Sequence, residues 1–165
     1  MNRTSYEESE MWAPWVTVVL GVCLLAAGFG LTQGRPGEAT LVLAFIFPVF
    51  VLLAVLFGRL RVRVQQDALV VGFGYVDVIK KRVVYDDVQS IEPVRYSPLG
   101  EFGGWGIKWG RGDKIAWTIR GNQALVMHLK NGKHLYVGSP TPARLAERVY
   151  QAAGDKLATG KSRDW

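Results

Sequence analysis

Two histidines are the residues whose chemistry could most readily build a site. His128 and His134 belong to two runs of alternating side chains, and a three-residue loop between these runs would place them opposite each other. Two imidazoles could begin a metal site, but a third ligand is needed and the sequence shows none nearby. We therefore interpret the pair as part of a solvated polar face, and we expect neither a metal nor a cofactor.

No catalytic constellation stands out elsewhere. The sole cysteine, Cys23, lies in a long apolar run, which argues against thiol nucleophiles and cysteine-based metal sites. Asp86 and Asp87 are adjacent, so in a strand they would point to opposite faces and could not pair as acid and base. The sequence contains no nucleophile elbow, no H-E-x-x-H motif and no P-loop. We expect no enzymatic activity.

The segment 102–111, FGGWGIKWGR, combines glycines with aromatic and basic side chains. Trp105 and Trp109 supply flat apolar surfaces beside Lys108 and Arg111. In one interpretation the tryptophans close the core of a β domain and the glycines permit its strands to bend. In another they contact a membrane interface or a partner protein. Single-stranded nucleic acid is recognised by similar residues, but we do not expect it here. The sequence leaves core and contact surface open for this segment.

Hydrophobicity and charge are divided between two parts of the 165-residue chain. Residues 59–165 contain 18 Lys and Arg against 10 Asp and Glu, whereas residues 1–58 are mainly apolar. The uncharged runs 11–31 and 39–57 are long enough, as helices, to cross a hydrocarbon core of about 30 Å. Turn residues connect them, so the sequence predicts an antiparallel transmembrane hairpin. A cleaved signal peptide is the alternative for the first run, but acidic residues precede it and it is too long.

Three arginines directly follow the second apolar run: Arg59, Arg61 and Arg63. Basic flanks of transmembrane helices remain in the cytoplasm, so we expect a multi-pass protein of the plasma membrane with both termini cytoplasmic. The arginines alternate with apolar residues and would share one face of a strand. We expect them to contact anionic lipid head groups of the inner leaflet.

From Arg59 onward, short alternating runs separated by turn residues predict consecutive antiparallel strands and a small barrel or sandwich. Thr141 and Pro142 predict the start of a helix that ends near Gly154. The predicted strands are 59–64, 68–73, 76–85, 88–96, 106–110, 114–120, 123–129 and 133–139.

The register of the last hairpin before that helix follows from matching the faces of its two strands. A two-residue turn would mix apolar and polar side chains on one face. A three-residue loop, 130–132, with Gly132 at positive φ, places Met127 opposite Leu135 and keeps one face apolar. We therefore predict the three-residue loop.

The chain after residue 58 resembles bacterial PH-like (pleckstrin-homology-type) domains. The resemblance rests on 83–92 (VVYDDVQSIE), a hydrophobic pair before a turn and a strand, and on the hairpin 124–139 with the helix after it. It covers residues 59–154 and implies a strongly bent antiparallel barrel that the C-terminal helix caps. Bacterial domains of this type often follow transmembrane helices. Phosphoinositide-binding relatives use basic residues in the first hairpin loop, but here 65–67 is Gln-Gln-Asp, so that activity is not implied.

The expected fold class is therefore a two-helix transmembrane hairpin followed by a small, mostly-β PH-like barrel capped by a C-terminal α-helix. The expected parts are a cytoplasmic tail (1–10), the hairpin (11–58), the PH-like domain (59–154) and a flexible tail (155–165). The expected function is a non-enzymatic, membrane-tethered binding or scaffolding module that contacts lipid head groups or a partner protein. The alternative is an accessory subunit of a larger membrane complex, packed through the hairpin. The expected contact residues are Arg59, Arg61, Arg63, Trp105, Lys108, Trp109 and Arg111.

Overall fold

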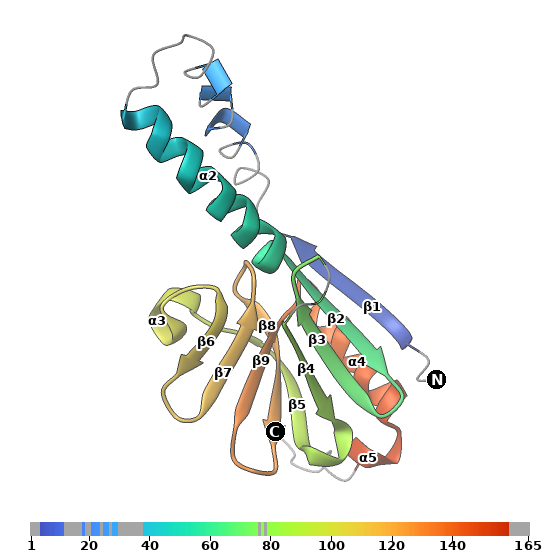
Figure 1. The fold of residues 1–165 in the computed structure, drawn as a ribbon. Helices are drawn as coiled ribbons and strands as arrows, with labels where there is room; N and C mark the ends of the chain where they lie inside the picture. The colour runs from blue at the N-terminus through green and yellow to red at the C-terminus, as the bar shows by residue number, and fades with distance from the viewer. Residues whose placement is uncertain are drawn as a thin grey trace.

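The computed structural model describes residues 4–11, 18, 21–23, 25, 26, 28, 29, 38–75, 77 and 79–158. These residues form a four-stranded and a five-stranded β-sheet (Figure 1). The first sheet is antiparallel throughout, in the order β1–β2–β3–β4. Its strands are β1 (Thr4–Met11), β2 (Arg59–Gln65), β3 (Ala68–Phe73) and β4 (Ile79–Val84).

The second sheet has the strand order β5–β8–β9–β7–β6. Its strands β7 and β9 are parallel, whereas the sequence predicted antiparallel neighbours only. The difference arises because the β8–β9 hairpin lies between β5 and β7, so β7 pairs with a strand that it does not directly precede. The strands are β5 (Val88–Arg95), β6 (Gly106–Gly110), β7 (Lys114–Thr118), β8 (Gln123–Leu129) and β9 (His134–Gly138).

The helical segments lie before, between and after the strands. They are α2 (Glu38–Phe57), the 3₁₀ turn η1 (Tyr85–Asp87), α3 (Pro98–Phe102), α4 (Pro142–Ala153) and α5 (Asp155–Ala158). The predicted C-terminal helix is confirmed as α4, with Thr141 at its N-cap and Gly154 at its C-cap. Residues 159–165 of the predicted tail lie outside the described residues.

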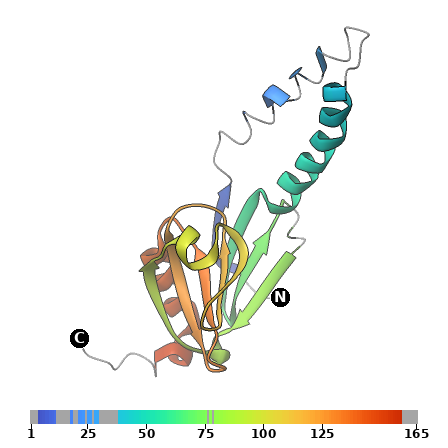
Figure 2. The ribbon, with the colours of Figure 1, turned by 90° about the vertical axis from the view of Figure 1, so that its left-hand side faces the viewer.

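The main core lies between the two sheets and α4 (Figure 2). The first sheet contributes one face of each strand to this core. In β2, Leu60, Val62 and Val64 are at most 2% exposed, while the intervening arginines point away from the core. The second sheet contributes buried residues such as Leu125 and Met127. Helix α4 adds its apolar face, which consists of Leu145, Ala146, Val149 and Ala153.

A smaller apolar cluster lies on the outer face of the second sheet. Three aromatic rings meet there, with centroids 5.8 Å apart for Tyr96 and Phe102 and 5.1 Å apart for Phe102 and Tyr136. Phe102 is the last residue of α3, so this cluster fixes α3 against the sheet. Edge-to-face packing of aromatic rings adds specificity to this contact.

The β8–β9 hairpin has the predicted three-residue loop. Met127 is the partner of Leu135, and the Leu129 amide donates to the Lys133 carbonyl at 2.8 Å. Gly132 has a φ of +81°, which a glycine adopts without steric cost. The predicted three-residue loop and strand register are therefore confirmed.

The N-terminal segment is a strand rather than the predicted tail. In β1, Glu7 is the partner of Arg63 and Ser9 is the partner of Arg61. Acidic residues are uncommon in strands, which is why composition alone did not indicate one. Opposite charges on paired strands offset that preference here.

Helix α2 leaves the first sheet and projects away from both sheets (Figure 1). Its base is fixed where the Tyr75 amide donates to the Val55 carbonyl at 3.1 Å and the Phe57 ring lies 6.3 Å from Phe73. Beyond this base its large apolar side chains are exposed: Phe45, Val49, Phe50, Leu52 and Leu53 are between 41% and 79% exposed.

Among the residues that the structure describes, no helix has both the length and the apolar character needed to cross a membrane. The predicted second span, 39–57, coincides with α2, whereas the first span, 11–31, lies largely outside the described residues. For the described chain, the predicted fold class is therefore wrong in its transmembrane hairpin. The multi-pass plasma-membrane localisation, with both termini cytoplasmic, depended on that hairpin and is wrong with it.

Candidate binding surface

Helix α3 owes its position to a reciprocal cap. The Ser97 hydroxyl accepts a hydrogen bond from the Gly100 amide at 3.2 Å, and the Ser97 amide donates to Glu101 Oε1 at 3.0 Å. Pro98 occupies the first turn, where its missing N–H is not needed. The cap holds the Glu101 side chain at the edge of the second sheet.

Glu101 then contacts strand β7. Its Oε2 accepts a hydrogen bond from Lys114 Nζ at 3.0 Å, and the same ammonium lies 5.6 Å from the centre of the Tyr136 ring. The Ser97 amide, and after it Lys114, hold the pKa of Glu101 below its ordinary value. The hydrogen bond that the Lys114 ammonium donates to Glu101 in turn raises the pKa of Lys114. Both groups therefore remain charged at neutral pH.

An open cavity of about 370 Å³ lies beside this ion pair, lined by Gly100, Glu101, Arg111 and Lys114. Arg111 belongs to the turn between β6 and β7 and is exposed. Lys114 is paired with Glu101, whereas no ion pair joins Lys108 or Arg111 to another described residue. The free charge around the cavity is therefore positive.

The two tryptophans of segment 102–111 are both at the surface. Trp109 is 74% exposed, and Trp105 is 44% exposed, with its indole N–H donating to the Gly121 carbonyl at 2.8 Å. The core position is taken instead by Trp117 of β7, which is 6% exposed. The interpretation of Trp105 and Trp109 as core residues is therefore wrong, whereas Phe102 of the same segment is buried.

Strand β6 is an edge of the second sheet. Side chains alternate along it, so Lys108 lies on one face and Trp109 on the other. Together with Trp105 before the strand and Arg111 after it, these residues surround the edge. We call Trp105, Lys108, Trp109 and Arg111 the β6 edge surface. The sequence indicated all four, but it did not indicate Glu101 and Lys114, which become neighbours only when α3 packs on the sheet.

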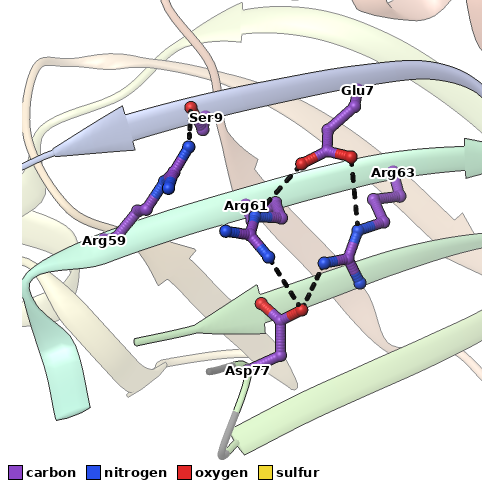
Figure 3. Close-up of polar contacts among 6 residues, drawn as sticks. All are labelled: Glu7, Ser9, Arg59, Arg61, Arg63 and Asp77. Carbon is purple, nitrogen blue, oxygen red and sulfur yellow. Dashed lines mark hydrogen bonds and ion pairs between the residues drawn. The ribbon is translucent and has the colours of Figure 1, made fainter. Parts of the chain in front are cut away.

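The three arginines of β2 lie on the first sheet, whereas the β6 edge surface belongs to the second. Figure 3 shows the side chains that they contact. Arg61 contacts Glu7 at 3.1 Å and Asp77 at 3.2 Å. Arg63 contacts the same two carboxylates, and Arg59 donates to the Ser9 hydroxyl at 3.0 Å. An anionic ligand at Arg61 and Arg63 would have to displace Glu7 and Asp77, so these arginines are not free cations.

The two histidines form a third polar cluster, on the outer face of the second sheet. They are partners across β8 and β9, as predicted, and their Nδ1 atoms are 2.7 Å apart. His128 Nε2 lies 3.0 Å from Glu92 Oε1. Glu92 could not be identified from the sequence, because its contact with His128 crosses diagonally from β5 to β8. The described residues contain no group of three or more His, Cys, Asp or Glu side chains that could hold a metal.

Two acidic side chains of β1, the buried Glu10 and the half-buried Glu8, contact residues that follow strands of the second sheet. Glu10 is only 7% exposed, and its Oε1 lies 3.6 Å from Arg120 Nε. Glu8 accepts a hydrogen bond from the Ser139 hydroxyl at 2.8 Å. Burial raises the pKa of both carboxyl groups above the ordinary value.

Comparison of the chain with protein-family models and with curated proteins finds no match. The resemblance to PH-like domains therefore stays a prediction, and the function has to be argued from the geometry.

Proposed function

We propose that the chain is a non-enzymatic binding module that recognises a partner protein through the β6 edge surface. The observation that carries the proposal is Trp109, which is 74% exposed on the edge strand β6. In the chain it lies between Lys108 and Arg111, two cations that form no ion pair with another described residue. Tryptophan and arginine are the side chains that most often dominate the energy of protein interfaces. An exposed indole in this setting is typical of a contact site.

The partner that fits this surface carries an apolar side chain next to an acidic one. Trp109 offers a flat apolar area, and Arg111, at the rim of the cavity, offers a planar guanidinium that can bind a carboxylate through two hydrogen bonds. Because Lys114 forms an ion pair with Glu101, the side chains that would select anionic groups are Arg111 and Lys108. We therefore expect acidic, aromatic-containing peptide segments as ligands.

The proposed PH-like character is compatible with this function. The resemblance implies a β domain with a closing helix, and α4 follows the last strand, β9. In such a module the β6–β7 hairpin would supply the contact surface at the edge of the second sheet.

Selection of peptides from a random displayed library on the full chain tests the proposal. We expect enrichment of acidic peptides that contain an aromatic residue. A Trp109→Ala variant should bind the selected peptides at least 30-fold more weakly, which matches the loss of about 2 kcal/mol or more that defines a dominant interface residue. Arg111→Glu should weaken the acidic peptides.

Tyr75→Ala is the matched control, because Tyr75 is also exposed, at 50%, but follows β3 in the first sheet. It should leave peptide binding unchanged. Selected peptides that bind wild type and Trp109→Ala equally well would refute the proposal.

A second candidate function rests on α2. Several large apolar side chains along it are exposed, and contiguous exposed apolar surface marks contact sites with other proteins. We propose, as the alternative, that the chain is an accessory subunit that packs against a larger protein through α2. Changing Phe45 and Leu52 to serine should then abolish co-purification with that protein, while binding of the selected peptides stays intact.

A further inference from the structure

We propose that the partner of the β6 edge surface binds as an extended strand, which adds to β6 and continues the second sheet. This inference rests on the proposed function and specifies the conformation in which the ligand is recognised. Strand β6 lies at the end of the order β5–β8–β9–β7–β6 and pairs with β7 alone. Its other side is the kind of sheet edge to which an extended peptide can pair.

The free side of β6 presents backbone groups that need partners. In an antiparallel pair, the amide and carbonyl of every second residue point away from the neighbouring strand. The β6–β7 register is unbroken from the pair Gly106–Thr118 to the pair Gly110–Lys114. Among the residues that the structure describes, residues 106–110 form no backbone hydrogen bond outside this pair. An added strand would satisfy the outward-pointing groups.

The other three edge strands carry features that discourage strand addition. Strand β4 has the consecutive basic residues 80–82, and β5 contains Pro93, which has no amide to donate. Strand β1 has three glutamates and an irregular register near its start. Strand β6 has one charged residue, Lys108, next to the exposed Trp109. Of the four edges, β6 is therefore the one best suited to accept a strand.

On one face of β6 the ligand would meet Trp109. This side chain shares its face with Ile107, which packs against the main core. The indole itself is 74% exposed. A ligand residue that pairs with Trp109 points to the same face, so an aromatic side chain at that position would pack on the indole.

On the opposite face the ligand would meet Lys108 and Arg111. Gly110 shares this face with Lys108, and a Cβ at Gly110 would be 2.8 Å from the Phe102 ring. Helix α3, and with it the cavity that Arg111 lines, therefore lies on the Lys108 face. Neighbouring residues of an extended ligand point to opposite faces. An acidic side chain one or three residues from the aromatic one would thus approach the two cations.

Synthetic peptides from the library selection, each with a single N-methylated peptide bond, test the inference. N-methylation removes one amide donor and blocks pairing on that side of a strand. Methylation at every second residue should weaken binding about 10-fold or more, because it leaves a backbone carbonyl of β6 unpaired. Methylation at the residues between should change binding less than about twofold. Calorimetry with the full chain measures both series.

Amide hydrogen exchange of the full chain gives a second readout. The unmodified peptide should protect alternate amides of β6, and it should leave the amides of the edge strand β4 unchanged. Lys108→Glu should weaken the acidic peptides about 10-fold, because it places like charges side by side. Lys80→Glu is the matched control, since Lys80 is also an exposed lysine on an edge strand. It should bind the peptides like wild type.

The pattern of the methylation series separates this inference from the proposed function. Equal losses at all positions, or losses that recur every third or fourth residue as in a helix, would overturn strand addition. A loss of binding in Trp109→Ala would still support the proposed function in that case. If Trp109→Ala binds like wild type, or if no peptide is selected, the proposed function fails and this inference fails with it.

Discussion

The carboxylate of Asp77 lies directly over Gly72. A methyl group at position 72 would be 2.8 Å from Asp77 Oδ1, closer than side chains approach. Because Gly72 is the partner of Arg61 across β2 and β3, its missing side chain leaves Asp77 room to reach both Arg61 and Arg63. Asp77 itself has a φ of +49°, a conformation that aspartate tolerates better than most residues.

Asp77→Ala should therefore destabilise the domain. It removes one of the two carboxylates from Arg61 and Arg63, whose side chains are only 17% and 26% exposed. We expect a loss of about 1–2 kcal/mol in the free energy of unfolding, measured by urea denaturation. Asp86→Ala is the control: its partner Lys156 is 41% exposed, so the change should stay below about 0.5 kcal/mol. Equal effects of the two variants would contradict this prediction.

Glu10→Gln should stabilise the protein at neutral pH. Burial is the main cause that raises the pKa of Glu10, so the folded state binds the carboxyl proton more tightly than the unfolded state. The protonated Glu10 carboxyl therefore stabilises the folded state. This stabilisation is fully present below the ordinary carboxyl pKa of 4.5 and is lost as the pH rises through the raised pKa of the folded state. The variant should exceed wild type in stability at pH 7 and not at pH 4.

Glu101→Gln should show the opposite sign. The pKa of Glu101 is lowered, so its contribution to stability exists above the ordinary carboxyl range and disappears as the pH falls. Urea denaturation at pH 4 and pH 7 checks both variants.

A Glu10→Gln variant that is less stable than wild type at pH 7 would contradict the first of these two predictions, because the ion pair of Glu10 with Arg120 would then outweigh the cost of burying the charge.

The two tryptophans Trp109 and Trp117 should differ strongly in their contribution to stability. Trp117 is 6% exposed and lies 5.8 Å from the Phe73 ring, so Trp117→Ala should cost about 3–5 kcal/mol. Trp109 is 74% exposed, so Trp109→Ala should cost less than about 0.5 kcal/mol. Thermal unfolding of both variants separates a role of Trp109 in binding from a role in folding.

Gly132→Ala should destabilise the β8–β9 hairpin by about 1 kcal/mol. Gly132 has a φ of +81°, and no atom lies within 4 Å of an added Cβ, so the cost is one of backbone conformation alone. Gly132→Asn should cost less, because asparagine tolerates this conformation better. Amide exchange in β8 and β9 measures the local effect, and equal rates in both variants would argue against a conformational cause.

The hairpin and the helix α4 could be predicted from the sequence because each depends on neighbours in the chain. The faces of β8 and β9 must match, and Thr141, Pro142 and Gly154 mark the ends of α4. The parallel pairing of β7 with β9 could not be predicted in this way, since nothing local to Lys114–Thr118 specifies a strand that follows 20 residues later.

In the candidate site, too, local features could be predicted from the sequence and long-range contacts could not. Trp109 and Arg111 were identifiable from their types and spacing, but the exposure of Trp109 depends on β6 being an edge strand. Glu92 reaches His128 from another strand, so the cluster is visible only in three dimensions. The prediction of the transmembrane hairpin was wrong because it relied on apolar run length alone.

The register of the first sheet has a consequence for the architecture of the gene product. Met11 and Arg59 are partners across β1 and β2. The chain leaves the sheet at one of two facing positions and returns at the other, so residues 12–58 are, topologically, an insertion at the tip of a β-hairpin. A turn of two to five residues could join the same two strands. The pairing of β1 with β2 therefore sets no requirement on the length of the segment that joins them.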